Sequence, residues 1–153
     1  MKRIYAIEKW CLQCKLCEVA CKTAHSKSKD TVKAFMLEGS TLQTRIHVEG
    51  DSFMSIAVNC RHCDEPACVD GCIAGAMQRN PETGAVFCDP SKFLGCRTCM
   101  TMCPYGCVHV EHVGNKGQAI KCDMCSEELG VPGEPSCVAA CPNRALIYVE
   151  SEA

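Results

Sequence analysis

The chain has 153 residues, of which 17 are cysteine and 5% are aromatic, and its formal net charge is −2. The low aromatic content excludes a large conventional core and predicts one domain, or two very small ones, supported by cross-links or bound groups. The charge is not typical of a nucleic-acid-binding protein, and no stretch approaches the roughly 18 consecutive apolar residues that indicate a membrane span.

The chain opens with a predicted strand that leads into a first group of cysteines. Residues 3–8 have the apolar composition of a strand. The group that follows has the spacing C-x2-C-x2-C-x3-C, the compact run that binds iron–sulfur clusters in two-cluster bacterial ferredoxins. In such a run the fourth cysteine ligates the neighbouring cluster, so these groups work in pairs. The first group consists of Cys11, Cys14, Cys17 and Cys21.

A charged segment and a β-hairpin are predicted between the first two groups. Residues 22–33 hold four lysines and one aspartate, a pattern typical of a solvated loop or, alternatively, of a docking surface for an acidic partner. Residues 44–49 alternate polar and apolar side chains, and residues 53–58 return after a turn at Gly50. We therefore expect two antiparallel strands directly before the second group.

The second and third groups enclose another predicted turn and strand. The second group has the spacing C-x2-C-x4-C-x3-C, whereas the third keeps the last three cysteines of the compact run and has Phe93 in place of the first. Residues 81–84 (PETG) predict a turn, and residues 85–88 a strand. The two groups consist of Cys60, Cys63, Cys68 and Cys72, and of Cys96, Cys99 and Cys103.

The last part of the chain repeats features of the first. A strand is predicted for residues 107–113, ended by Gly114. The fourth group has an eleven-residue insert and shares the pattern Pro-x-Cys-Val-x-x-Cys with the second. We expect residues 145–150 to form a strand paired with the first one, and short helices between the third and fourth cysteines of each group. The fourth group consists of Cys122, Cys125, Cys137 and Cys141.

Two other uses of cysteine fit the spacing poorly. Zinc sites combine two separated pairs of ligands, and only the fourth group has that form. A disulfide framework belongs to secreted chains, whereas the opening MKRIYAIEKW has no apolar signal region and predicts a reducing cytoplasm. The pattern therefore favours iron–sulfur clusters, with five histidines in surface or strand positions and His62 able to donate a hydrogen bond to a cluster sulfur.

Four cysteine runs are spread along nearly the whole chain: CLQCKLCEVAC, CRHCDEPACVDGC, FLGCRTCMTMCPYG and KCDMCSEELGVPGEPSCVAACPNRAL. Together they resemble the four-cluster ferredoxin-like subunits of molybdenum and tungsten oxidoreductases, formate dehydrogenases and hydrogenases. The opening run, with the later HSKSKDTVKAF segment, is most similar to the ferredoxin partner of nickel carbon monoxide dehydrogenase. The resemblance implies an α+β fold of two ferredoxin-like modules with pseudo-twofold symmetry, residues 1–50 and 115–153 forming the outer module and residues 51–114 the inner one.

The resemblance also implies which cysteines share a [4Fe-4S] cluster. The outer module is expected to bind one cluster through Cys11, Cys14, Cys17 and Cys141, and another through Cys21, Cys122, Cys125 and Cys137. The inner module is expected to bind a third cluster through Cys60, Cys63, Cys68 and Cys103. A fourth cluster is left with Cys72, Cys96 and Cys99, and so lacks one ligand.

Phe93 stands where the missing ligand is expected, and its side chain has no donor atom for iron. Three outcomes are consistent with the sequence: a three-iron cluster, a four-iron cluster completed by another residue, or no cluster. Cys88 precedes Phe93 by five residues and is favoured as the replacement over Cys107, which follows Cys103 by four. Both cysteines are equally consistent with ordinary buried thiols.

The predicted function is electron transfer without catalysis, because the chain has no dinucleotide-binding glycine motif, phosphate loop or nucleophile–base pair. The resemblance implies a catalytic partner, carbon monoxide dehydrogenase first, or else a formate dehydrogenase, aldehyde oxidoreductase or hydrogenase. A flavin reductase or a hydrogenase is the expected acceptor. A redox sensor that responds to loss of a cluster is an alternative of another class, and no effector domain accompanies it.

Overall fold

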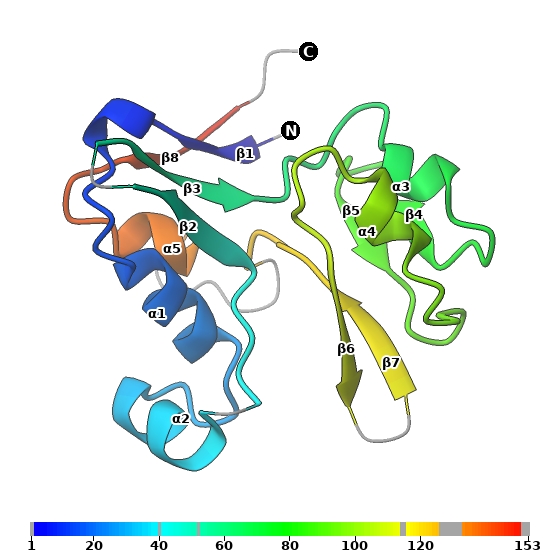
Figure 1. Cartoon of the computed structure of the whole chain (residues 1–153), viewed down its shortest axis with the longest axis horizontal. Helices are drawn as coiled ribbons and strands as arrows, with labels where there is room; N and C mark the ends of the chain where they lie inside the picture. The colour runs from blue at the N-terminus through cyan, green and yellow to red at the C-terminus, as the bar shows by residue number, and fades with distance from the viewer. Residues whose placement is uncertain (1, 40, 52, 114–115, 126–132, 151–153) are drawn as a thin grey trace.

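The two ends of the chain pair with each other. The computed structural model describes residues 2–39, 41–51, 53–113, 116–125 and 133–150. Strand β1 (Lys2–Ala6) runs antiparallel to β8 (Leu146–Glu150), with Ile4 opposite Tyr148, and the N and C labels lie close together in Figure 1. The predicted pairing of the first and last strands is confirmed.

Three further two-stranded ribbons follow along the chain. Strand β2 (Ile46–Gly50) pairs with β3 (Ser55–Asn59), as the hairpin prediction required. Gly50 has a φ of 138°, and a Cβ atom there would stand 2.1 Å from the carbonyl oxygen of Met54, so only glycine fits this turn. The Asp51 carboxylate closes the turn by accepting hydrogen bonds from the backbone N–H groups of Phe53 and Met54 at 2.8 and 3.0 Å.

The remaining ribbons lie in the other half of the molecule (Figure 1). Strand β4 (Met77–Arg79) pairs with β5 (Val86–Cys88) around the predicted turn, and β6 (His109–Val113) pairs with β7 (Lys116–Ile120). The end of the strand predicted at Gly114 lies outside the described residues. Most of the insert in the fourth cysteine group lies outside them as well.

Each cysteine group carries a helix at the predicted place. The helices are α1 (Leu16–Ala24), α3 (Ala67–Asp70), α4 (Thr98–Met102) and α5 (Ser136–Ala139), and a 3-10 turn (Glu8–Trp10) precedes the first group. Lys15 and Arg97 precede α1 and α4 in the left-handed conformation, with φ of 58° and 61°. Pro66 and Pro135 instead precede α3 and α5 in extended conformation. The two compact groups therefore share one way of starting a helix, and the two longer groups share another.

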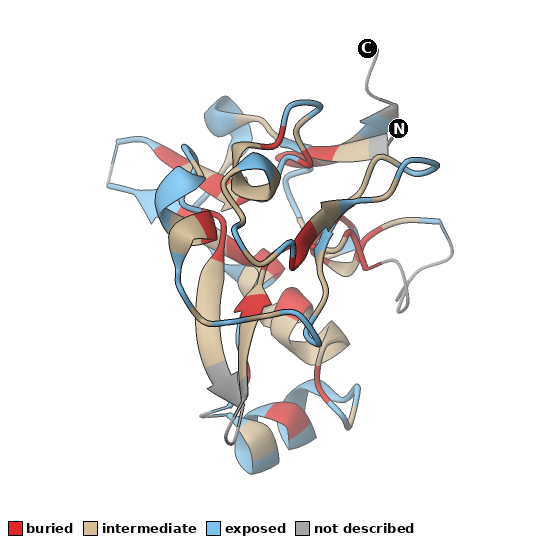
Figure 2. Ribbon diagram, turned by 90° about the vertical axis from the view of Figure 1, so that its right-hand side faces the viewer, coloured by how far each residue is buried: buried red, intermediate tan, exposed pale blue. Residues whose placement is uncertain are grey.

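Helix α2 (Thr31–Glu38) was not expected from the sequence. The loop prediction for residues 22–33 is wrong at both ends, because Lys22 belongs to α1 and Lys33 to α2. Asp30 caps the helix by accepting a hydrogen bond from the backbone N–H of Lys33 at 2.9 Å. Ala34 is the buried residue of α2, the lowest helix in Figure 2, and the rest of its surface is largely exposed.

The buried residues form two clusters, one in each half of Figure 1. The first gathers around β1, β2, α1 and α5, and the second around β4, β5, α4 and β7. Strand β3 lies within the bounds of the predicted inner module but packs on the first cluster. Strand β7 lies within the bounds of the predicted outer module but packs on the second. The division into two modules stays a prediction. Within the described part of the chain, no helix has the length and apolar character needed to span a bilayer.

Candidate metal centres

Four cysteines from the two ends of the chain line one cavity. Two come from the loop after β1, one from the first turn of α1, and one follows α5. Trp10, Leu12 and Pro142 form apolar parts of the wall. We call these cysteines the first set: Cys11, Cys14, Cys17 and Cys141.

The second set lies where α1 packs against α5. Its four thiols are all buried, and Cys21, Cys122 and Cys137 belong to one packed cluster of residues. Burial raises the pKa of Cys122 to about 12, so this thiol is protonated in the absence of a metal. The second set consists of Cys21, Cys122, Cys125 and Cys137.

The third set lines a cavity in the other half of the molecule. Helix α3 contributes one cysteine and the end of α4 another, and these two helices pack side by side (Figure 1). Gly71, just after α3, permits this approach, because a Cβ atom there would lie 2.8 Å from Cγ of Met102. The third set consists of Cys60, Cys63, Cys68 and Cys103, and Cys107 lines the same cavity.

The fourth set has three of the predicted ligands near one another. Cys99 is buried, the charges of Cys72 and Cys96 act on it, and Cys96 itself is exposed. Cys88 packs in the same cluster of residues, as does Phe93. The fourth set therefore consists of Cys72, Cys96 and Cys99.

The four sets follow one another in a row. Cys17 and Cys21 on α1 connect the first set to the second, and Cys68 and Cys72 around α3 connect the third to the fourth. The halves meet where Cys60 of the third set packs against the buried cluster that contains Cys122 of the second. Among the seventeen cysteines, all of them described, those classed as exposed are Cys14 and Cys96, which belong to the first and fourth sets.

Backbone amides point at several of these sulfurs. N–H groups of Arg45, Met77, Met124 and Ala145 donate to cysteine Sγ atoms at 3.2 to 3.4 Å, reaching Cys21, Cys72, Cys122 and Cys141. Such hydrogen bonds stabilise thiolates and lower the energy of a reduced cluster. Thiolates grouped in this way, with amides directed at them, fit iron–sulfur clusters well.

A charged network not foreseen from the sequence lies beside the second set. Nδ1 of His25 lies 2.8 Å from the carbonyl oxygen of Cys21 and 3.8 Å from its Sγ. Nε2 of His25 is 3.2 Å from the Asp123 carboxylate, which also binds Arg45. Burial opposes a charge on His25, but hydrogen bonds with Asp123 and Cys21 raise its pKa to about 10. His25 follows Cys21 by one helical turn, and that spacing is the signal that could have revealed it.

His62, the histidine predicted to donate a hydrogen bond to a cluster sulfur, has its Nε2 buried and without a hydrogen-bond partner among the described residues, so that role stays a prediction. Its Nδ1 accepts a hydrogen bond from the backbone N–H of Val86 at 3.0 Å. Burial, together with the charge of Lys121, lowers the pKa of His62 to about 3, so the ring is neutral. Lys121 is also buried, and its ammonium group donates to the carbonyl oxygens of Val86 and Cys122. A cation therefore lies between the two halves, where its charge acts on Cys68 and Cys88.

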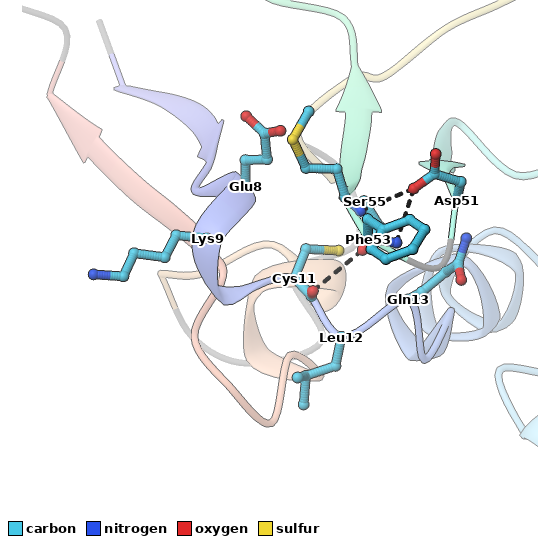
Figure 3. Close-up of a pocket in the computed structure, with 9 residues that line it drawn as sticks. Glu8, Lys9, Cys11, Leu12, Gln13, Asp51, Phe53 and Ser55 are labelled. Carbon is cyan, nitrogen blue, oxygen red and sulfur yellow. Dashed lines mark hydrogen bonds between the residues drawn. The ribbon is translucent and has the colours of Figure 1, made fainter.

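An open hollow of about 550 Å³ adjoins the first set. Figure 3 shows Cys11 and Ser55 side by side at its edge, with the Ser55 hydroxyl donating to the Cys11 carbonyl oxygen at 3.2 Å. The Gln13 amide also donates to the carbonyl oxygen of Gly50, so the β2–β3 turn is fastened to the cysteine loop. Phe53 is 96% exposed, which gives the molecule an apolar surface next to the first set.

Comparison with known proteins identifies the family. A profile of the 4Fe-4S dicluster domain matches residues 52–151. The chain is 36% identical over 143 residues to the putative electron transport protein YsaA of Escherichia coli K12, covering 93% of this chain and 85% of that protein. It is 35% identical over 153 residues to the electron transport protein HydN of the same strain, with 92% and 83% coverage. YnfG of that strain, named as part of a probable anaerobic dimethyl sulfoxide reductase, is 34% identical over 142 residues, with 90% and 68% coverage. The chain therefore belongs to the 4Fe-4S dicluster domain family.

Proposed function

We propose that this chain transfers electrons through four iron–sulfur clusters between a catalytic oxidoreductase and a redox partner. The observation that carries the proposal is the row of four cysteine sets whose two ends, at Cys14 and Cys96, are exposed. The names of the relatives YsaA and HydN, both electron transport proteins, support the same function.

The fifteen cysteines of the four sets are the proposed ligands, as the resemblance implied. When bound, clusters of this kind accept and donate single electrons at potentials that depend on charge, hydrogen bonds and exposure. The chain supplies those conditions differently at each set, because the second set is buried whereas the first and fourth each have an exposed cysteine. We infer that partners exchange electrons at the two exposed ends and that the interior protects the second set from solvent.

Charged residues distinguish the sets further. His25, which carries a positive charge, stands beside Cys21 of the second set, and buried Lys121 lies between the second and third sets. Both cations favour the more negative, reduced state of a nearby cluster. The protein therefore has the means to hold its central clusters at higher potentials than their ligands alone would give.

A catalytic subunit is the proposed partner at one end of the row. The similarity to YnfG, which is named for a dimethyl sulfoxide reductase, supports a place within an oxidoreductase complex. Carbon monoxide dehydrogenase stays the predicted partner, with formate dehydrogenase, aldehyde oxidoreductase and hydrogenase as alternatives from the same resemblance. We place this exchange in the cytoplasm and assign the chain no catalytic step of its own.

Purification under anaerobic conditions, followed by iron and acid-labile sulfide analysis, tests the proposal. We expect about 15 or 16 irons per chain and electron paramagnetic resonance signals of reduced clusters that interact magnetically. Stopped-flow mixing with each reduced candidate partner then identifies the one that reduces the clusters fast. Stoichiometric zinc with negligible iron would overturn the electron-transfer function.

A further inference from the structure

The fourth set needs a donor that its own loop does not contain. Phe93 occupies the position of the missing cysteine, and its ring packs against β7, since a Cβ atom at Gly117 would lie 3.0 Å from Cε1 of Phe93. The ring belongs to the apolar cluster that also includes Val108 and Ala119. Phe93 is therefore a packing residue, and a fourth ligand has to come from another element.

Strand β5 brings Cys88 to this set. Cys88 is the last residue of β5 and pairs with Met77 of β4, whose backbone N–H donates to Sγ of Cys72 at 3.4 Å. The next residue, Asp89, donates its backbone N–H to the carbonyl oxygen of Ala76 at 2.7 Å. Strand pairing thus sets Cys88 beside Met77, and the N–H of Met77 binds Cys72. Through Met77, the β4–β5 ribbon brings Cys88 and Cys72 close together.

The thiol of Cys88 lies among the cysteines of the fourth set. It packs against the same buried cluster as Cys72, and that cluster contains Cys99. Burial raises the pKa of Cys88, and the backbone amide of Ala119 partly opposes this rise. A half-buried thiol among other cysteines resembles the ligands of the other sets.

Cys107 is placed elsewhere. It lines the cavity of the third set, and the neighbouring thiols that act on it are Cys103 and Cys60. Its Sγ donates to the carbonyl oxygen of Tyr105 at 3.3 Å. Since the third set already has four cysteines, Cys107 is a buried thiol beside a complete set.

We propose that Cys88 replaces the cysteine missing at Phe93, so that Cys72, Cys88, Cys96 and Cys99 together bind a four-iron cluster. This inference rests on the proposed function. The fourth ligand of the set then comes from strand β5 and not from the start of the cysteine loop at position 93. The iron bound by Cys88 is then fixed by the β4–β5 ribbon and does not depend on the loop around Gly95.

Replacement of Cys88 by alanine tests the assignment, with Cys107→Ala as the matched control. We expect about 16 irons per chain in the anaerobically purified wild-type protein, without the signal of an oxidised three-iron cluster. Cys88→Ala should lose one iron and gain that signal, or lose the whole fourth cluster, whereas Cys107→Ala should keep the wild-type iron content and spectrum. The double variant Cys88→Ala/Phe93→Cys should recover the lost iron.

Two results overturn the assignment. One is a stoichiometric three-iron signal in the wild-type protein. This measurement does not depend on whether a variant folds. The other is a Cys88→Ala variant with unchanged iron content and spectrum. Both leave at least three clusters in place, so the electron-transfer function survives them, whereas a wild-type protein without iron removes that function as well.

Discussion

At the scale of single residues, the sulfurs are surrounded by charges that the cysteine pattern does not reveal. The four cysteine groups could be predicted because ligand spacing is local in sequence, whereas sets that combine distant cysteines, such as Cys141 with Cys11, were implied only by the family resemblance. Asp123 and Arg45, by contrast, meet His25 only after folding, since they lie on separate segments. The charge of His25 was unpredictable for the same reason.

Replacing His25 by phenylalanine should lower the reduction potential of the second-set cluster. The change removes a cation and a hydrogen-bonding group beside Cys21, and both stabilise the reduced state. A loss of about 1.4 kcal/mol corresponds to about 60 mV for a one-electron step. A redox titration followed by paramagnetic resonance measures the shift. His25→Gln keeps a donor and should shift less, and equal potentials in all three proteins would contradict the role.

Replacing Lys121 by methionine should destabilise the assembled protein. The buried ammonium donates to the carbonyl oxygens of Val86 and Cys122, and its loss leaves both without this partner. Each unsatisfied buried acceptor costs about 1–3 kcal/mol, which predicts a fall in Tm of roughly 5–10 °C. Thermal unfolding under anaerobic conditions measures it, and Lys9→Met, at an exposed lysine, should leave Tm unchanged.

At the scale of elements, most strands and the cysteine helices were predicted, whereas β4, β7 and α2 were not. The strands have apolar runs bounded by turn residues, and the helices are tied to ligand spacing. Residues 22–33 are polar and contain neither signal. Their defined structure comes from side chains that accept hydrogen bonds from backbone N–H groups. Asp30 does so at the start of α2, and Glu38 accepts from the N–H groups of Lys27 and Ser28.

Replacement of Asp30 by alanine should loosen α2 without loss of iron. The cap contributes about 1 kcal/mol to a helix that buries Ala34 alone among its residues. Amide hydrogen exchange across residues 31–38 should therefore quicken about fivefold, while the amides of α1 keep their rates. Glu82→Ala, in an exposed turn of the other half, serves as the control. Unchanged exchange in α2 would show that the cap has no role.

The turn at Gly50 offers a second test at this scale. Alanine there requires a left-handed residue whose Cβ atom meets the Met54 carbonyl at 2.1 Å, so we expect Gly50→Ala to cost more than 2 kcal/mol of stability, about twice the usual penalty for a positive φ. Gly75→Ala is the matched control, because Gly75 also has a positive φ, 62°, but no atom within 4 Å of its Cβ position. Equal losses of Tm in both variants would contradict this account of the turn.

At the scale of the whole molecule, the two buried clusters contain cysteines throughout. Eleven residues of the first cluster are buried, and four of them are cysteines: Cys17, Cys21, Cys122 and Cys137. A core of this composition cannot be stable by apolar burial alone, because a buried thiol contributes little area. Metal–thiolate bonds must supply much of the folding free energy.

Anaerobic removal of iron should therefore unfold both halves together. We expect the chelated protein to lose its tertiary circular dichroism and the protection of its amides, and to regain both when iron and sulfide are restored. An iron-free protein that keeps native spectra would contradict this dependence on metal.

The pairing of the chain's two ends has a consequence for biosynthesis. Cys141 lines the same cavity as Cys11, so the first set is complete only after almost the entire chain has left the ribosome. The third set is complete once Cys103 has emerged. A nascent chain thus carries Cys11, Cys14 and Cys17 without their fourth partner during most of its synthesis. Clusters inserted during synthesis would therefore form in the middle of this chain first and at its beginning last.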